Sequence, residues 1–377
     1  MRVAYVYESA ASDINVQSGH PYSILKELER KSEKVFPIFP LDDRLKYIFA
    51  PRYAYYRARD MVYRPDREPL LLRSLARQVE RRLKGKAVDV LFCPGSHLVG
   101  WLDLPIPTIF CADATFRNVV GFYDSFRSCA PEYLRKGHDL DRRALSNCSA
   151  AIYPSQWAAD SAVRDYGADP GKVHVVPFGA NIDEPDAAAV ASLIGSKSME
   201  HLHILFIGRE WERKGADLVL DACAKLAGNG VSLSLHVVGI DKAPVPLPAF
   251  AKSYGLLRKD NPSHAEIFRN LLEKSHFLFV PSRAENYGMV FCEAAAFGIP
   301  SVTSSVGGNP TIVKNGETGI CLGRNDPADR YASAILDVIR SASRYRDMAT
   351  RCSRDYRTRL SWSNFGDRLM QIAQSVV

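Results

Sequence analysis

Short apolar runs alternate with helix-length amphipathic stretches along almost the whole chain. The runs are bounded by Gly, Pro or Asp and lie at residues 3–7, 35–39, 88–93, 108–111, 150–153 and 173–176, then at 202–207, 232–238, 277–280 and 299–303. Between them, apolar residues recur at helical spacing, as at Leu75, Val79 and Leu83. Strands that alternate with helices form parallel sheets covered by helices on both faces. The sequence therefore predicts an α/β fold of Rossmann-like, doubly wound sheets.

The alternation pauses once, at residues 181–200, a stretch rich in Ala, Ser and Asp. A chain of 377 residues exceeds the roughly 250–300 residues at which a single core stops growing. We therefore predict a first domain over 1–183, a linker over 184–200 and a second domain over 201–358. Two such domains would face each other across a cleft at the carboxyl ends of their strands, where open α/β sheets bind ligands.

A basic turn follows the strand predicted at 202–207. Arg209 comes after Gly208, and Lys214 lies just before a helix that begins at Ala216. Such turns hold phosphates because the first N–H groups and the dipole of a helix attract anions. Arginine offers a fixed two-pronged donor and lysine a movable charge, so Arg209 and Lys214 can grip a diphosphate from two sides. The alternative is an ordinary solvated turn.

Two glutamates, Glu285 and Glu293, follow the strand predicted at 277–280. We predict a helix that begins near Asn286, with Gly288 allowing close approach of the backbone to a ligand. On a helix, eight residues separate two carboxylates by roughly 12 Å and about 80°, so one can meet a sugar ring and the other a ribose. Two exposed glutamates are the alternative, and it is weaker for Glu293 because its neighbours are apolar and an unpaired buried carboxylate is costly.

The order of these motifs resembles the retaining glycosyltransferases of family 4, which have the GT-B fold. The resemblance rests on Gly-Arg-x4-Lys-Gly at 208–215, Glu-x7-Glu at 285–293, Gly-Ile-Pro-Ser-Val at 298–302 and Val-Gly-Gly-Asn-Pro at 306–310. It implies a hexosyltransferase that moves a sugar from a nucleotide diphosphate sugar, a UDP- or GDP-sugar, to a lipid-linked or polysaccharide acceptor. The resemblance further implies retained anomeric configuration, no metal and no cofactor.

The resemblance also implies roles for single residues. Glu285 would hold the donor sugar as a catalytic residue, and Glu293 would bind the donor ribose. The remaining residues of the implied site are the diphosphate ligands Arg209, Lys214, Gly19, Gly288, Met289 and Val290, and the pocket residues His20, Asn286 and Tyr287. The last stretch, 359–377, is amphipathic, and in the family such a helix packs back on the first domain.

The first domain departs from the family pattern in its strand-end loops. Where relatives often carry a double glycine, this chain has Gly19 and His20. Gly19 still permits close approach, whereas His20 is either a pocket residue or an outward residue at a helix start. Asp113 stands where the family often has histidine; it is either a catalytic residue near the acceptor hydroxyl or donor sugar, or an N-cap. Thr311 stands where the family often has glutamate, which points to a different donor.

Residues 44–87 form a strongly basic segment. It contains thirteen Lys and Arg residues and four Asp and Glu residues, so its net charge is +9, against +7 for the whole chain. Six aromatic residues are interleaved with them: Tyr47, Phe49, Tyr53, Tyr55, Tyr56 and Tyr63. Basic residues beside interfacial aromatics suit an anionic membrane surface or an acidic acceptor. A solvated helical face is the equally weighted alternative, and we expect no nucleic-acid partner.

Other motifs are assigned to structure rather than chemistry. Asp139-Leu140-Asp141 falls inside a helical run, so we assign it to the surface instead of a metal site. His201 and His203 alternate on a strand edge without a third ligand, and two exposed histidines are favoured. Neither a Gly-x-Gly-x-x-Gly nor a Gly-x4-Gly-Lys-Ser/Thr motif occurs, which argues against a nicotinamide dehydrogenase and against a P-loop NTPase.

Eight scattered cysteines without a Cys-x-x-Cys pair indicate buried reduced thiols. With no signal-peptide pattern and no apolar run of ~18 residues, we expect a cytoplasmic protein, peripheral on the inner face of the plasma membrane if the basic segment binds lipid. Three functions remain open: the glycosyltransferase, a GT-B sugar-nucleotide epimerase or glycoside phosphorylase, and a sugar-nucleotide binding protein without turnover.

Overall fold

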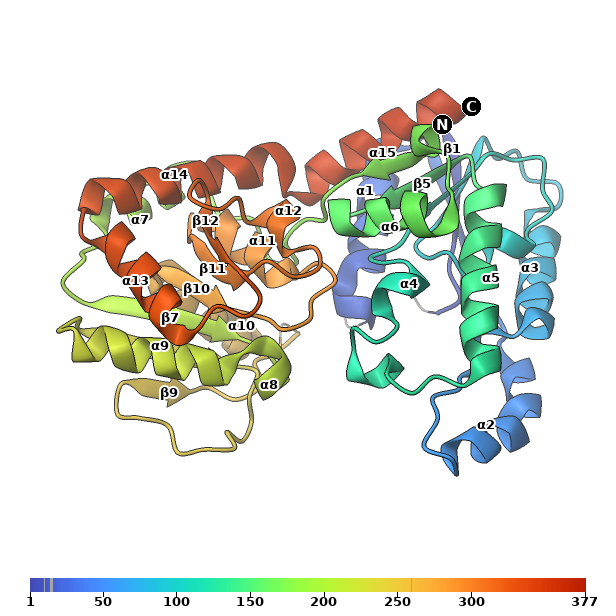
Figure 1. Ribbon diagram of the computed structural model, residues 1–377. Coiled ribbons are helices and arrows are strands. Elements are labelled where there is room, and N and C mark those ends of the chain that lie inside the picture. Colours follow the sequence, from blue (N-terminus) through green and yellow to red (C-terminus); the bar gives the residue numbers. More distant parts are fainter. Residues whose placement is uncertain (10, 14–15, 259) are drawn as a thin grey trace. The chain divides into compact units, whose positions relative to one another are not determined.

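The computed structural model describes residues 1–9, 11–13, 16–258 and 260–377. The chain divides into two compact units (Figure 1): unit 1 comprises Met1–Phe178 and Trp362–Val377, and unit 2 comprises Gly179–Ser361. Each unit is built on one six-stranded sheet whose strands all pair in parallel. The predicted pair of Rossmann-like domains is therefore confirmed.

The sheet of unit 1 has the strand order β2-β1-β3-β4-β5-β6. Its strands are β1 (Arg2–Val6), β2 (Lys34–Ile38), β3 (Val90–Cys93), β4 (Thr108–Cys111), β5 (Ala150–Tyr153) and β6 (Val173–Val175). Each matches a predicted apolar run. The helices are α1 (His20–Lys31), α2 (Ala50–Arg57), α3 (Pro69–Leu83), α4 (Phe116–Val119), α5 (Pro131–Asn147), α6 (Gln156–Tyr166) and α15 (Trp362–Val376), with short 3-10 helices η1 (Val16–Gly19), η2 (Arg44–Phe49) and η3 (Pro65–Arg67) among the connections.

The sheet of unit 2 has the strand order β12-β11-β10-β7-β8-β9. Its strands are β7 (Leu202–Ile207), β8 (Leu233–Val238), β9 (Ala251–Ser253), β10 (Phe277–Val280), β11 (Ser301–Ser304) and β12 (Gly319–Leu322). The helices are α7 (Ala187–Ser196), α8 (Trp211–Lys214), α9 (Ala216–Gly228), α10 (Pro262–Lys274), α11 (Met289–Ala296), α12 (Asn309–Ile312), α13 (Ala328–Ile339) and α14 (Ala342–Arg359). The two edge strands, β9 and β12, were not among the predicted runs.

The cores explain why these elements form. Strands β3, β4, β5 and β10 are buried at every position, as expected for parallel strands covered on both faces. Helix α3 buries Leu75, Val79 and Leu83 along one stripe and turns its arginines outward. All eight cysteines are free thiols, and burial raises the pKa of those at Cys93 and Cys111.

The stretch 184–200, predicted to be a linker, instead contains α7, and the boundary between the units falls earlier, between Phe178 and Gly179. The Asp186 carboxylate caps this helix by accepting a hydrogen bond from the backbone N–H of Ala189 at 2.9 Å. Alanine has the highest helix propensity, and α7 buries Val190 and Ile194 within unit 2. The alanine-rich composition therefore marks a helix, not a flexible connection.

Helix α15 returns the chain to unit 1, where it packs against α1. Lys31 and Asp367 form an ion pair at 2.5 Å, and the Phe178 ring stacks on Trp362 with centroids 5.5 Å apart. A Cβ atom on Gly366 would lie 2.7 Å from the Glu27 carboxylate, so the two helices approach closely at this glycine. Among the described residues, no helix is long and apolar enough to cross a membrane.

Candidate functional site

Two loops meet at the carboxyl ends of the neighbouring strands β7 and β10. After β7 comes the single turn of α8, which lays the Lys214 side chain over Gly208; a Cβ atom there would lie 2.7 Å from Lys214 Cγ. After β10, the chain passes Pro281, whose carbonyl oxygen would lie 2.5 Å from a Cβ atom on Gly215. Gly215 has φ +74°. Glycine at 215 thus allows the two loops to approach each other, and glycine at 208 leaves room for the Lys214 side chain.

Lys214 and Glu285, 71 residues apart in the chain, form an ion pair at this junction. The Ser282 hydroxyl donates to the same Glu285 oxygen at 3.3 Å, and Arg213 Nη1 lies 3.9 Å from it. Both charged side chains are about nine-tenths buried. Charges removed from water interact more strongly than exposed ones, so this pair presents a fixed cation beside a fixed carboxylate at a sheet edge.

Helix α11 begins beside the pair. Gly288 precedes it with φ +79°, and a Cβ atom at Gly288 would meet the Phe291 ring at 2.7 Å and Glu285 Cγ at 3.2 Å. Within the described parts of the chain no side chain caps the helix, and the first N–H groups, those of Met289 and Val290, have no acceptor within it. Such a helix start attracts an anion.

The helix begins later than the sequence predicted, at Met289 rather than near Asn286. Glu285 therefore lies in the loop before the helix, and helical spacing does not describe its separation from Glu293. The error arises because Gly288, in a left-handed conformation, turns the chain immediately before the helix. Glu293 lies inside α11 and is buried.

The other predicted residues of unit 2 differ in exposure. Arg209 is exposed, and its side chain has no hydrogen-bond or ion-pair partner within the parts of the chain that the structure describes. Tyr287 is buried, with its hydroxyl 3.5 Å from the Cys292 sulfur, so its ring turns into the core of the unit. Asn286 is partly exposed.

In unit 1, Gly19 has φ +85° and immediately precedes α1. His20 is buried: its Nδ1 lies 2.8 Å from the Gln17 carbonyl oxygen, and its ring stacks on Phe178 with centroids 5.1 Å apart. The alternative of an outward histidine is therefore wrong. Burial lowers the pKa of His20, while the charge of Asp113 acts in the opposite direction. The ring is thus favoured in its neutral form.

Asp113 is exposed after β4. It does not cap the following helix, because Thr115 does so by accepting a hydrogen bond from the backbone N–H of Asn118 at 3.2 Å. The N-cap alternative is therefore wrong for Asp113.

Several polar side chains near these loops were not predicted. Arg213 donates to the Ala284 carbonyl at 2.9 Å and thereby joins α8 to the Glu285 loop. In unit 1, Asp141 is buried rather than on the surface, and it accepts from Ser96 Oγ at 3.0 Å and from the Phe116 N–H at 2.5 Å. Its position on the same helical face as the buried Leu145 was the available signal.

A histidine cluster lies across β7, β8 and β10: His201, His203 and His276 are at the amino ends of β7 and β10, and His236 is within β8. His203 Nδ1 lies 3.1 Å from His236 Nε2, and His276 Nδ1 accepts from the His203 N–H at 3.0 Å. His201 and His203 are therefore packed in this cluster instead of being two isolated exposed histidines. Among the described residues, no group of three His, Cys, Asp or Glu side chains could hold a metal ion.

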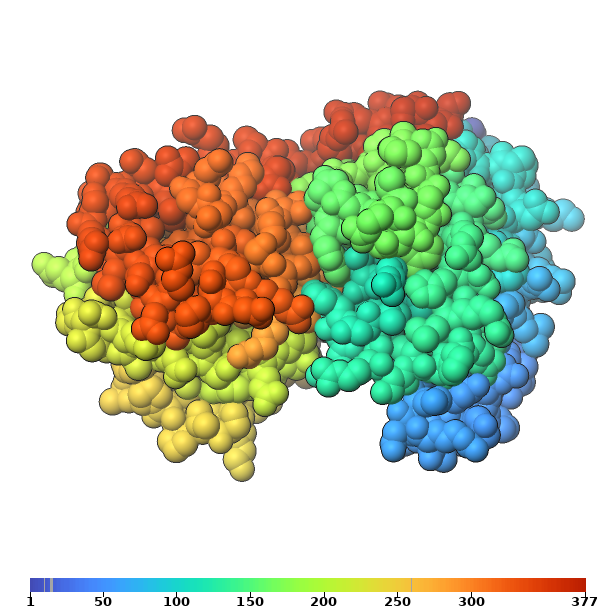
Figure 2. All heavy atoms as spheres, in the orientation of Figure 1, coloured from blue at the N-terminus to red at the C-terminus, as the bar shows by residue number. Residues whose placement is uncertain are grey.

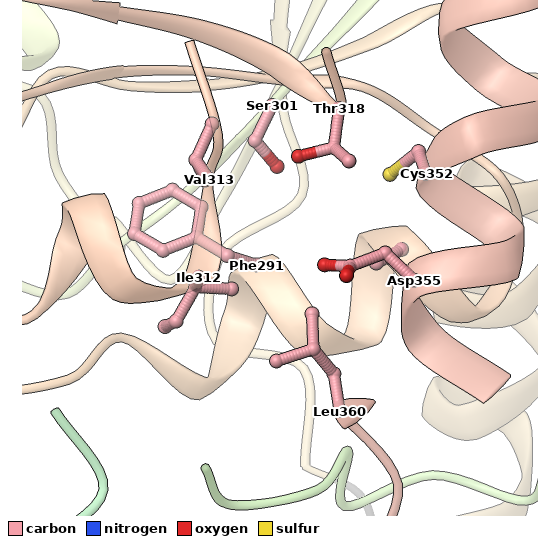
Figure 3. Close-up of a pocket in the computed structure, with 9 residues that line it drawn as sticks. Phe291, Ser301, Ile312, Val313, Thr318, Cys352, Asp355 and Leu360 are labelled. Carbon is pink, nitrogen blue, oxygen red and sulfur yellow. The ribbon is translucent and has the colours of Figure 1, made fainter. Parts of the chain in front are cut away.

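A small pocket lies elsewhere in unit 2, between α11, the segment after α12, and α14 (Figure 3). Ser301, Thr318 and Asp355 point their oxygen atoms toward its interior. The Asp355 carboxylate is already paired with Lys314 at 2.8 Å and Arg359 at 2.6 Å. None of the predicted site residues lines this pocket, so it is separate from the candidate site.

Two family models match consecutive parts of the chain. Glycosyltransferase Family 4 matches residues 20–184, and Glycosyl transferases group 1 matches residues 195–355. The D-inositol 3-phosphate glycosyltransferase of Geodermatophilus obscurus is 33% identical over 223 residues, which cover 55% of this chain and 48% of that protein. The Rhodococcus jostii protein of the same name is 29% identical over 61% of this chain and 53% of its own length. The chain spans about half the length of the curated relatives it matches.

Solved structures share the fold over the whole chain. Sucrose-phosphate synthase from Thermosynechococcus elongatus has a TM-score of 0.70 at 17% identity, covering 100% of this chain and 99% of that one. Anabaena HepE in complex with UDP-glucose has a TM-score of 0.63 at 14% identity, covering 100% of both chains. The two family models, which together match residues 20–184 and 195–355, show that the chain belongs to glycosyltransferase family 4, and the solved structures together with the two six-stranded sheets show that it has the GT-B fold.

Proposed function

We propose that the chain is a retaining hexosyltransferase that moves a sugar from a nucleotide diphosphate sugar to a lipid-linked or polysaccharide acceptor without a metal ion. The observation that carries this proposal is the junction of Lys214, Glu285 and the uncapped start of α11. A donor of this kind offers a diphosphate for the cation and the helix start, and sugar hydroxyls for the carboxylate.

The leaving group explains why these charges matter. When the bond between the sugar and the diphosphate breaks, negative charge develops on the departing phosphate oxygen. Lys214, Arg209 and the N–H groups of Met289 and Val290 would stabilise that charge, and donors fixed before the reaction are worth most in a site that excludes water. Glu285 holds Lys214 in place, so the cation would be positioned before the donor arrives.

The remaining contacts follow from where each side chain stands. Glu285 would hold hydroxyls of the donor sugar, and Glu293, farther along α11, would hold the ribose. In unit 1, Gly19 would allow the backbone to approach the diphosphate, His20 would line the pocket, and Asp113 would act near the acceptor hydroxyl. The exposure of Asp113 and its freedom from capping α4 support that last assignment.

Donor and acceptor classes are supported by what the relatives bind. Anabaena HepE is solved with UDP-glucose, which supports a nucleotide diphosphate sugar, a UDP- or GDP-sugar, as the donor. The curated relatives are named for an inositol phosphate acceptor. A hydroxyl group of a saccharide or of a lipid head group could accept the sugar in the same transfer reaction.

A donor panel tests the reaction. The protein is incubated with UDP- and GDP-sugars, with and without a mixture of saccharide and lipid-linked acceptors, and both nucleotide release and sugar transfer are measured. We expect acceptor-dependent release of one nucleotide, with the α-anomer of an α-linked donor retained in the product. Donor isomerisation without acceptor would indicate an epimerase, phosphate-dependent release would indicate a phosphorylase, and donor binding without release would indicate a binding protein.

Transfer is expected to survive removal of divalent metal. In the proposed site, Arg209 and Lys214 neutralise the diphosphate, so chelation by EDTA should leave the initial rate within about twofold, a barrier change of less than ~0.5 kcal/mol. The measurement compares rates in EDTA, in magnesium and in manganese. A rate that falls at least tenfold in EDTA and recovers with one of the metals would overturn the metal-free part of the proposal.

A further inference from the structure

Unit 1 carries an exposed projection formed by η2, α2 and the residues that follow, 44–61, here called the α2 projection. No residue of η2 or α2 is buried, although the segment is rich in large apolar side chains. Those most exposed are Tyr47, Ile48, Tyr53, Tyr55 and Met61, with exposures from 38% to 67%. In Figures 1 and 2 this blue segment extends beyond the end of α5 at the margin of unit 1.

The α2 projection is held to unit 1 by Leu45 and Phe49, which pack against buried apolar clusters, and by polar contacts. Arg52 reaches Glu68 at 3.2 Å and Glu132 at 3.4 Å, and the ring of Tyr56 stacks on the buried Tyr63 with centroids 5.5 Å apart. The rings of Tyr47, Tyr53 and Tyr55 are not among the side chains packed against these clusters. Exposed apolar side chains gathered in one segment mark an interaction surface more often than scattered ones do.

Some basic side chains of residues 44–87 are held by contacts within the protein, whereas others are exposed to solvent. Arg44 and Lys46 pair with Asp42 and Asp43, and Arg67 is buried over the Phe116 ring. Arg57 is exposed, and its side chain has no hydrogen-bond or ion-pair partner within the described residues. Arg59 lies over the Tyr55 ring at 3.7 Å, so it reinforces the projection's own surface.

Helix α3 extends this surface. Its exposed positions include Leu70, Arg73, Arg77 and Arg81, spaced three or four residues apart along one stripe. Gln78 joins α3 to the start of the projection through two hydrogen bonds of 2.8 Å with the Asp42 backbone. Helix α3 therefore adds three exposed arginines and one exposed leucine to the exposed apolar and basic side chains of the projection.

We propose that the α2 projection is a docking surface for an anionic lipid bilayer. Tyr47, Ile48 and Tyr53 would enter the boundary between head groups and acyl chains, where aromatic rings are favoured, while Arg57 and Arg59 contact lipid phosphates. Charge complementarity selects an anionic surface. This inference goes beyond the proposed reaction, because docking requires neither donor nor transfer and holds whether the acceptor is a lipid or a soluble saccharide.

Cosedimentation with vesicles tests the charge component. The full chain is mixed at low salt with vesicles of phosphatidylglycerol and phosphatidylcholine, or of phosphatidylcholine alone, and we expect binding only to the anionic vesicles. Arg57→Ser with Arg59→Ser should weaken binding roughly 30-fold, because the two arginines near an anionic surface contribute similar shares of the binding free energy, each worth about a five- to sixfold change in affinity. The matched control, Arg330→Ser with Arg346→Ser, removes two exposed arginines of unit 2 and should change binding by less than about threefold.

A second pair of variants tests the apolar component. Tyr47→Ser with Ile48→Ser should weaken vesicle binding at least tenfold at physiological salt, whereas Val245→Ser with Ile267→Ser, an exposed apolar pair in unit 2, should not. The proposal is overturned if the parent protein ignores anionic vesicles at low salt, or if the arginine pairs of both units have equal effects. Binding to single-stranded nucleic acid in preference to vesicles would also overturn it.

Discussion

Replacing Glu285 with glutamine is expected to lower turnover by about a hundredfold or more, while affinity for a free nucleoside diphosphate changes by less than about threefold. The removal of one preorganised contact to the reacting group costs ~10²–10³ in rate. Free nucleoside diphosphate has no sugar for Glu285 to hold, and the amide oxygen of glutamine can still accept hydrogen bonds from Lys214 and Ser282. Steady-state kinetics and titration calorimetry on the same preparation separate the two effects.

Glu293→Gln provides the contrast, because the ribose is present in the free nucleotide. This variant should weaken nucleotide binding about tenfold or more, the cost of a hydrogen bond to a charged group. Glu273→Gln, an α10 residue paired with Arg269 at 2.9 Å, is a matched control that should leave both quantities unchanged. Equal losses of nucleotide affinity in the Glu285 and Glu293 variants would contradict the proposed order of sugar and ribose.

Acidification is expected to destabilise unit 2 through the histidine cluster. Burial, with smaller contributions from nearby lysines, lowers the pKa of His236 from 6.5 to about 3 and that of His276 from 6.5 to about 4. The charged and titratable groups around these two rings are Lys197, His201, His203, Lys252, Tyr254, Lys274 and Tyr345. These named neighbours include no carboxylate that could stabilise a second positive charge.

The sign of this pH effect on stability follows from the number of protons that the folded and unfolded chains bind. Above pH 6.5 both rings are neutral in the folded and unfolded chains, so their full contribution to stability is present. Between about pH 6.5 and 4, the unfolded chain binds two protons that the folded chain excludes. The free energy of unfolding should then fall by as much as ~2.7 kcal/mol per pH unit, about 1.4 for each proton.

Urea unfolding of unit 2 at pH 7.5 and 5.0 measures this loss. His236→Gln should retain more of its neutral-pH stability at pH 5.0 than the wild type does, because one of the excluded protons is removed. His264→Gln, a histidine of α10 outside the cluster, should keep the wild-type difference between the two pH values. Identical pH dependence in the wild type and His236→Gln would contradict this account.

The parts of the fold that the sequence predicts are those with strong local patterns. The buried strands are continuous apolar runs, so β3, β4, β7 and β10 could be located before the structure. The edge strands of unit 2, β9 and β12, were missed; β9 contains Lys252 and Ser253 and is only three residues long. Helix α7 was mistaken for a linker because Ala and Ser content was weighed above the Asp186 cap that its sequence contains.

The candidate site was predictable in composition but not in geometry. The apolar runs of β7 and β10 predict two buried strands. Lys214 and Glu285 each follow one of these strands, so the sequence places both residues at the carboxyl ends of the strands. Their direct ion pair depends on the left-handed turns at Gly215 and Gly288, and glycine content alone does not specify which conformation a turn adopts. The burial of His20 likewise depends on Phe178, which is distant in sequence.

Titration calorimetry with UDP and GDP tests the central claim most directly. We expect the wild-type chain to bind at least one of them, and Arg209→Ala and Lys214→Ala each to bind it ten- to hundredfold more weakly, because a charge-assisted contact is worth roughly 1.5–3 kcal/mol. Lys225→Ala, which removes an exposed lysine paired with Asp329, should bind like the wild type. Unchanged affinity in both site variants, or no binding of either nucleotide by the wild type, would contradict a donor diphosphate site at the β7–β10 junction.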